Sequence, residues 1–448
     1  MTPHAPVTAE PDRASPAAWA TIAAFLLIGL YMYCDRHVMV LQTDRIKASL
    51  SLSDFQVGLV QGLGVAIFAS LVGYPIAWLA DRFSRRLVLA LCVLAWTGAV
   101  IASALAQSFA VLFLATAVVG AGEAGLIPIS YAVIPELFAG RARLLANSIM
   151  TVVGRLGSGI VIALSGQLAQ HAGAMRPFLP AAWQGLEDWR LALLAVAAPG
   201  PLFLLIVAVV RLYRPSGPAA TSAAARPPAA PVWPFLSRNL AMFACFYAGI
   251  GLFIFGTSAF GAFLPVVAMR QMGASPGAVG AGFGVATLVS TLIALLLVTG
   301  GGRWLQLWWG ARYPIWLLLL ASIMPAAFAP LFLLTTTPTQ IYLLLGVNFL
   351  FLAGGTMVFP TALQDLTPAP SRARLASISI MINIAFSALA PVAVGALSDQ
   401  LKGRANGLML ATVGTAMAAL VLSAALLFLC VPRYLATIAA ARDEEARV

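Results

Sequence analysis

The chain has 448 residues, of which 61% are hydrophobic and only 9% are charged. Soluble domains carry about 25% charged residues, so this composition excludes a soluble globular protein and indicates an integral membrane protein. The formal net charge of +11 would suit a nucleic-acid partner, but the arginines lie at the ends of apolar segments. The charge is therefore attributed to membrane topology, and no nucleic acid is expected.

A membrane-spanning helix needs about 20 apolar residues, and twelve segments of this kind are predicted. They cover residues 17–43, 54–80, 87–106, 109–134, 144–169, 190–211, 239–268, 276–299, 312–333, 339–363, 373–398 and 406–431. The stretch from Leu87 to Gly122 contains no charge and is too long for one span. It is predicted to form two helices that meet at residues 106–108. The fold class is therefore all-α and integral to the membrane.

Basic residues predict the orientation, because cytoplasmic loops carry an excess of lysine and arginine. With the N-terminus in the cytoplasm, the arginine-rich stretches 81–86, 141–143 and 372–374 all fall on the cytoplasmic side. We therefore expect a multi-pass protein of the cell (inner) membrane with both termini in the cytoplasm.

An internal repeat divides the chain into two halves. The sequence RARLLANSIM at 141–150 recurs as RARLASISIM at 372–381, and a stretch rich in proline, alanine and serine separates the halves. We predict a tail (1–16), a six-helix bundle (17–211), a cytoplasmic linker (212–238), a second six-helix bundle (239–431) and a C-terminal tail (432–448). Two six-helix repeats in parallel orientation are typical of transporters that bind substrate near the midplane between the repeats.

Four ionisable residues fall inside predicted spans of the first half: Asp35, Arg36, Glu123 and Arg155. Charges in such positions face the bundle interior or an aqueous cavity and pair with one another. A carboxylate in a low-dielectric cavity beside an arginine can exchange a proton, and the arginine fork suits an anionic headgroup. Asp35 and Glu123 are thus candidates for proton coupling, and Arg36 and Arg155 for contacts with those acids or with substrate. The alternative is that all four form structural ion pairs.

The second half offers no charge of this kind, but the segment GLFIFGTSAFGAF at 251–263 is rich in phenylalanine. Phe253 and Phe260 are candidates for contact with a lipid tail, or else they pack within the bundle. Glu136 and Asp365 stand close to the two RAR sequences and are predicted to be ion-pair partners of an inner gate.

The sequence AWLADRFSRR at 77–86 resembles the motif between the second and third helices of the major facilitator superfamily. The resemblance implies two pseudo-symmetric bundles and a cytoplasmic latch made by the residues Asp81, Arg82, Arg85 and Arg86. The motif's two glycines are replaced here by Ala77 and Ser84. The stretches YCDRHV at 33–38 and GAGEAGLIPISYAVIPELF at 120–138 resemble segments of Spinster-type transporters. The resemblance implies a bacterial member of that family and a proton-linked carrier of lysolipids or sphingosine phosphate.

The sequence therefore predicts a monomeric, proton-coupled secondary transporter that moves an amphiphilic small molecule or lipid by alternating access among membrane lipids. A multidrug or organic-solute/proton antiporter of the same superfamily is the alternative function. A membrane sensor without transport activity is a further alternative. No nucleophile–base or metal-ligand cluster is apparent, so we expect no enzymatic activity, no metal and no cofactor other than the proton gradient.

Overall fold

The computed structural model describes residues 15–138, 140–210, 232–368 and 371–447, and the side chains of Asp81 and Arg155 lie outside this description. Most of the predicted N-terminal tail and linker therefore also lie outside it. The first half contains the following helices: α1 (Pro16–Tyr31), α2 (Cys34–Leu41), α3 (Thr43–Leu50), α4 (Asp54–Gly58), the π-helix η1 (Leu59–Gly64), α5 (Val65–Arg82), α6 (Arg85–Ala104), α7 (Phe109–Glu123), α8 (Leu126–Leu137), α9 (Gly140–His171), the short 3-10 helices Ala172–Phe178 and Ala181–Trp183, α10 (Asp188–Ala197) and α11 (Gly200–Val209).

The second half begins with the short helix α12 and continues with six long helices. Their bounds are α12 (Val232–Arg238), α13 (Leu240–Met272), α14 (Pro276–Trp309), α15 (Tyr313–Phe328), α16 (Pro338–Leu366), α17 (Arg372–Gln400) and α18 (Gly407–Arg447). Short 3-10 segments follow α14 and α15 at Gly310–Arg312 and Ala329–Leu334.

Twelve segments of the described chain are long and apolar enough to cross a membrane, which confirms the predicted number. The charge-free stretch divides as expected, because α6 ends at Ala104 and α7 begins at Phe109. The Ser108 side chain caps α7 by accepting a hydrogen bond from the Val111 amide, which satisfies one of the free amides at a helix start.

Two spans are interrupted beside their intramembrane charges. The first breaks between α1 and α2, directly before Asp35, and the fourth breaks between α7 and α8, directly after Glu123. Discontinuous spanning helices are typical of transporter binding sites. In the second span, the π-helix η1 lies between α4 and α5, and π-helical turns are frequently found at functional sites.

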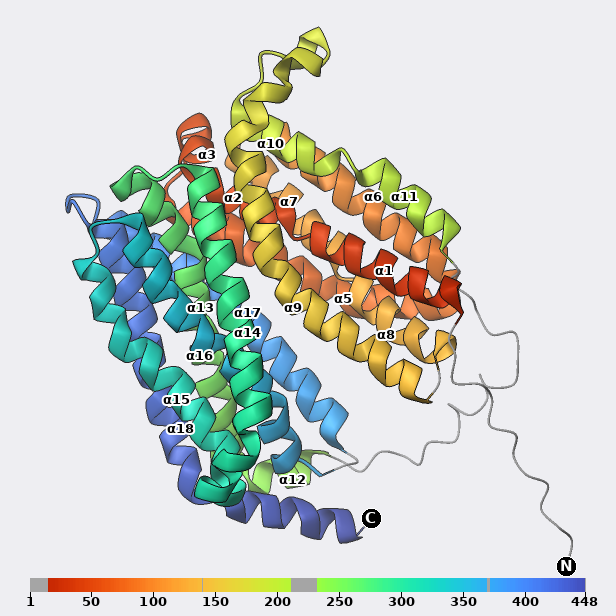
Figure 1. Cartoon of the computed structure of the whole chain (residues 1–448), viewed down its shortest axis with the longest axis vertical. Coiled ribbons are helices and arrows are strands. Elements are labelled where there is room, and N and C mark those ends of the chain that lie inside the picture. The colour runs from red at the N-terminus through yellow and green to blue at the C-terminus, as the bar shows by residue number, and fades with distance from the viewer. Residues whose placement is uncertain (1–14, 139, 211–231, 369–370, 448) are drawn as a thin grey trace, which may run out of the picture.

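The two halves pack together at one end of the molecule and diverge toward the other (Figure 1). Glycines allow this close contact, since small residues let helix backbones approach. Gly159 and Gly166 of α9 face Gly284 and Gly280 of α14. On the other side, Gly62 of η1 lies against the backbone of α17. We call the end that carries α3 and the start of α4 the closed end, and the opposite end, where α11 ends and α12 begins, the linker end.

Charged side chains join the halves at the closed end. Arg270 of α13 pairs with Asp44 at 2.6 Å and with Asp54 at 3.3 Å. Asp399 of α17 accepts hydrogen bonds from the amides of Asp54 and Phe55, at 3.1 and 2.9 Å. The second half thus caps the first turn of α4 in the first half.

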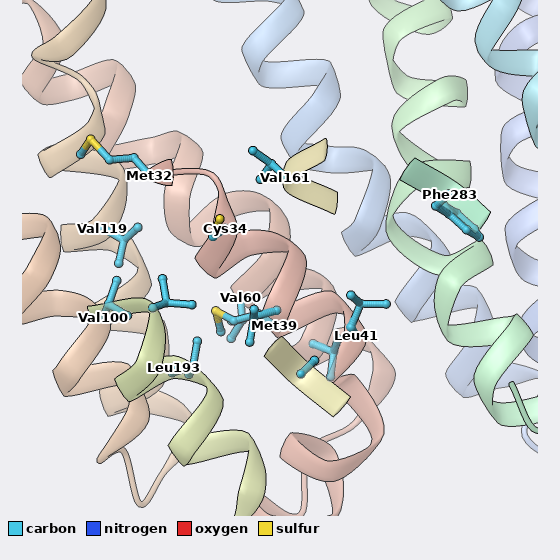
Figure 2. Packing of buried hydrophobic residues seen from close by; sticks show 14 of the residues in the cluster. Met32, Cys34, Met39, Leu41, Val60, Val100, Val119, Val161, Leu193 and Phe283 are labelled. Carbon is cyan, nitrogen blue, oxygen red and sulfur yellow. The ribbon is translucent and has the colours of Figure 1, made fainter. Parts of the chain in front are cut away.

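Apolar packing continues from one half to the other. A single cluster of buried residues contains Val60 of η1, Val161 of α9 and Phe283 of α14. Figure 2 shows these three side chains among others of the cluster, with Val60 close to Met39 of α2 and Phe283 further away on α14. The apolar core therefore helps to hold the closed end together.

Helical structure extends beyond two predicted boundaries. α12 lies in the stretch predicted to be linker, where Phe235 is buried. α18 continues through the predicted C-terminal tail to Arg447. Its last part bends and runs across the lower end of the bundle in Figure 1. Tyr434, Ile438 and Ala441 are buried along this extension, and their helical spacing gives it one apolar face that packs on the second half.

Candidate functional site

A cavity with a volume of about 620 Å³ lies between the halves. The first half supplies its charged wall from α2, η1, α5, α7 and α8 and from the breaks before α2 and after α7, and α17 alone supplies the facing wall from the second half. The lining residues are Tyr33, Arg36, Gln61, Gly62, Val65, Ala66, Ala69, Glu123, Ala124, Pro128, Ile380, Asn383, Ile384, Ser387 and Ala388.

Arg36 and Glu123 form an ion pair at the cavity wall, in which Arg36 Nη2 donates to Glu123 Oε2. The Arg36 side chain is 40% exposed, whereas the Glu123 side chain is only 9% exposed. The Arg36 guanidinium also lies over the Tyr33 ring, 5.4 Å from its centroid. The arginine can therefore reach a ligand in the cavity while it holds the carboxylate of Glu123.

Asp35 points away from this cavity. It is only 2% exposed and is not among the lining residues. Successive residues of an α-helix point about 100° apart, so one residue of the adjacent pair faces the cavity and the other faces the bundle. Among the residues that the structure describes, Asp35 Oδ1 is buried without a hydrogen-bond partner, and so is the indole Nε1 of Trp96 on α6.

The other predicted substrate contacts are not placed at the cavity. Phe253 and Phe260 are 2% and 1% exposed and pack inside the second half. Phe253 lies against Gly355 of α16, and the ring of Phe260 lies 5.2 Å from that of Phe332. Both are core residues in this conformation. The Arg155 side chain lies outside the described part of the chain.

The contacts described for the predicted gate residues lie within single halves. Arg85 pairs with Glu136, Arg86 donates to the Val210 carbonyl at 3.0 Å, and the Arg82 guanidinium lies 4.5 Å from the Trp78 ring centroid. In the second half, Tyr434 donates to Asp365 at 3.5 Å. These contacts fit halves that are separated at the linker end. The Asp81 side chain falls outside the description.

Sequence reasoning missed the polar residues of the cavity that carry no charge. Gln61 lies on η1, and Asn383 and Ser387 lie on α17. Asn383 and Ser387 are four residues apart and so share one helix face. That spacing within an apolar span was a signal available in the sequence.

Comparisons with known proteins agree with this architecture. The profile described as Major Facilitator Superfamily matches residues 19–391. An MFS-type efflux pump of Mycolicibacterium smegmatis (strain ATCC 700084 / mc(2)155) is 29% identical over 402 residues, which cover 88% of each chain. The sphingosine-1-phosphate transporter SPNS2 of Xenopus tropicalis is 29% identical over 175 residues, which cover 38% of this chain and 34% of that protein.

A solved structure is similar over nearly the whole chain. It is a bacterial homolog of the human lysosomal transporter Spinster in an inward-facing and unoccupied conformation, with a TM-score of 0.80 and 23% identity. The match covers 95% of this chain and 99% of that chain, and at this identity it establishes the fold. Because the superfamily profile spans most of the sequence, the chain belongs to the Major Facilitator Superfamily of membrane transporters and resembles Spinster proteins within it.

Proposed function

We propose that this transporter is proton-coupled and moves an amphiphile with an anionic headgroup, such as a lysolipid or a sphingoid phosphate, by alternating access. The observation that carries the proposal is the Arg36–Glu123 ion pair at the wall of the cavity between the halves.

The ion pair offers a direct way to couple a proton to the substrate. Protonation of Glu123 removes its negative charge and weakens its hold on Arg36. The freed guanidinium then binds the anionic headgroup, for which its planar fork is well suited. Asp35 is the second candidate for carrying a proton, because a fixed charge on a buried oxygen without a partner is costly.

The rest of the cavity suits the apolar part of an amphiphile. Val65 and Ala66 of the first half and Ile380 and Ile384 of α17 line it beside the charged pair. The similarity to a protein named as a sphingosine-1-phosphate transporter points to the same substrate class.

The distribution of arginines assigns the linker end to the cytoplasm. The conformation described above is then open to the cytoplasm, and the closed end faces the opposite side of the membrane. We assign Asp81, Arg82, Arg85, Arg86, Glu136 and Asp365 to the gate that closes the linker end in the other state.

A second candidate function is proton-driven efflux of organic solutes or drugs, which the long match to an MFS-type efflux pump favours. In that case a cationic substrate would compete with Arg36 for Glu123. The two candidates differ in the sign of the coupling. A proton on Glu123 promotes binding of an anion but opposes binding of a cation.

Flux in proteoliposomes with an imposed pH gradient tests the proposal. We expect the gradient to drive transport of a lysophospholipid with a phosphate headgroup, and Glu123→Gln to abolish the gradient dependence while the protein still inserts into the membrane. A matched control is Glu187→Gln, the same substitution at a side chain that is 51% exposed before α10 and does not line the cavity, and it should leave the gradient dependence intact. Equal flux with and without the gradient in the unaltered protein would contradict proton coupling.

A further inference from the structure

Four buried polar atoms without a hydrogen-bond partner belong to residues that line the cavity. They are Arg36 Nε, Gln61 Oε1, Glu123 Oε1 and Asn383 Oδ1, and the statement applies to the described residues. Arg36 and Glu123 belong to the ion pair discussed above. Gln61 and Asn383 have no part in the proposed proton step. A buried amide oxygen without a hydrogen-bond donor is nevertheless unfavourable, because its lost hydration is not replaced.

The hydrogen bonds around Gln61 fix which of its amide atoms is free. Thr43 Oγ1 donates to the Val40 carbonyl at 2.8 Å, so that hydroxyl can act only as an acceptor toward Gln61. Gln61 Nε2 donates to it at 2.9 Å. The amide nitrogen is therefore used, and Gln61 Oε1 remains as an acceptor. Its place in the π-helix η1 agrees with the frequent use of such turns at functional sites.

Asn383 presents a similar acceptor from the other half. It lies on α17 between the apolar residues Ile380 and Ile384, which cannot donate a hydrogen bond. Ser387, one turn further along, is already paired with Ser258, with the two hydroxyl oxygens 3.0 Å apart. No hydrogen bond to Asn383 Oδ1 is present among the described residues, so this oxygen is available to a donor from the contents of the cavity.

We propose that Gln61 and Asn383 form an uncharged subsite that accepts hydrogen bonds from a hydroxyl group of the substrate, beside the anionic group held by Arg36. Because these oxygens are buried and unpaired, a ligand that supplies donors to them gains affinity over one that leaves them unpaired. The inference rests on the proposed function and narrows it: the substrate is a single-chain amphiphile with a hydroxylated headgroup, as opposed to a fatty acid or an alkyl phosphate.

Two probes that differ by one hydroxyl test the subsite. Oleoyl lysophosphatidic acid carries a free hydroxyl beside its phosphate, and its deoxy analogue lacks only that group. We expect the unaltered protein in nanodiscs to bind the hydroxylated probe roughly 3- to 10-fold more tightly, the range for one neutral hydrogen bond. Asn383→Leu should bring this ratio close to one by weakening only the hydroxylated probe, and Gln61→Met serves as a second variant.

Asn348→Leu is the matched control. Asn348 is a buried asparagine of α16 whose Oδ1 also lacks a partner, but it does not line the cavity, so this variant should keep the ratio of the unaltered protein. Equal affinity of the unaltered protein for both probes would overturn the subsite and leave the proposed function standing. A ratio that survives both Asn383→Leu and Gln61→Met would also overturn it. Failure to bind either probe would overturn both proposals.

Discussion

Arg36 and Asp35 are neighbours in the sequence but have different surroundings. Arg36 is 40% exposed and paired with Glu123, whereas Asp35 is buried and faces the first bundle. A substitution at Arg36 therefore changes the cavity, while one at Asp35 changes the packing around α6 and α2.

Removal of the guanidinium should reduce affinity for anions selectively. We expect Arg36→Ala to weaken binding of lysophosphatidic acid by roughly 10- to 100-fold, the range for a hydrogen bond to a charged group, and to weaken binding of zwitterionic lysophosphatidylcholine less. Competition binding with both lipids measures this difference. Arg176→Ala is the control, because Arg176 pairs with Asp188 outside the cavity at 2.8 Å. Equal losses for the two lipids would indicate that Arg36 has only a structural role.

Asp35, Arg36 and Glu123 are conspicuous in the sequence, because ionised side chains within an apolar span are rare. The structure places Arg36 and Glu123 at the cavity and Asp35 away from it, and their roles stay predictions. The sequence did not indicate Gln61 and Asn383, because a neutral polar residue in a spanning helix is common and its partners depend on tertiary contacts. The core position of Phe253 was unpredictable for a similar reason: phenylalanine suits a lipid, a ligand and a bundle core equally well.

At the scale of helices, the spans followed from length and hydropathy, but their interruptions did not. The break between α1 and α2 consists of Met32 and Tyr33, and neither residue is a glycine or proline that would indicate a break in the sequence. The π-helix η1 likewise lies against a distant segment, since Gly62 meets the Ala388 carbonyl of α17 across the interface. Local sequence does not encode a contact with a residue in the other half of the chain.

The close contact at Gly62 predicts a conformational effect of a larger side chain. A Cβ atom at this position would clash with the Ala388 backbone, so we expect Gly62→Val to separate η1 from α17 and to favour opening of the closed end. Labelling of a cysteine introduced at Ser53, in a background without the four native cysteines, should become faster with an impermeant maleimide.

Gly98→Val is the control for that experiment. Gly98 lies on α6, and a Cβ there meets nothing within 4 Å, so the labelling rate should not change. An unchanged rate in Gly62→Val would show that the interface adapts without separation of the halves.

At the scale of the whole molecule, two kinds of contact hold the closed end. Glycine-mediated packing of α9 on α14 and of η1 on α17 provides close apposition, and the charged cluster around Asp54 adds directional bonds. Asp54 has a side chain only 3% exposed, and it accepts hydrogen bonds from Lys47 at 2.6 Å and Ser398 at 2.8 Å. Lys47 belongs to the first half, so opening of the closed end requires the bonds of Asp54 to Arg270 and Ser398 to break, but not the bond to Lys47.

Arg270 is the cation of the second half that pairs with two acids of the first, Asp44 and Asp54. We expect Arg270→Ala to shift the equilibrium toward opening of the closed end, by about 1–3 kcal/mol or roughly 5- to 150-fold in population, because burying Asp54 without this partner is less favourable. Distances between spin labels placed on α3 and on the loop after α17 would report the shift. Arg45→Ala removes an arginine at the same end that pairs with Asp188 within the first half, at 3.3 Å, so it should leave those distances unchanged. If both variants keep the distance distribution of the unaltered protein, glycine packing and the capping of α4 by Asp399 are sufficient to hold the closed end, and the Arg270 pairs do not control access.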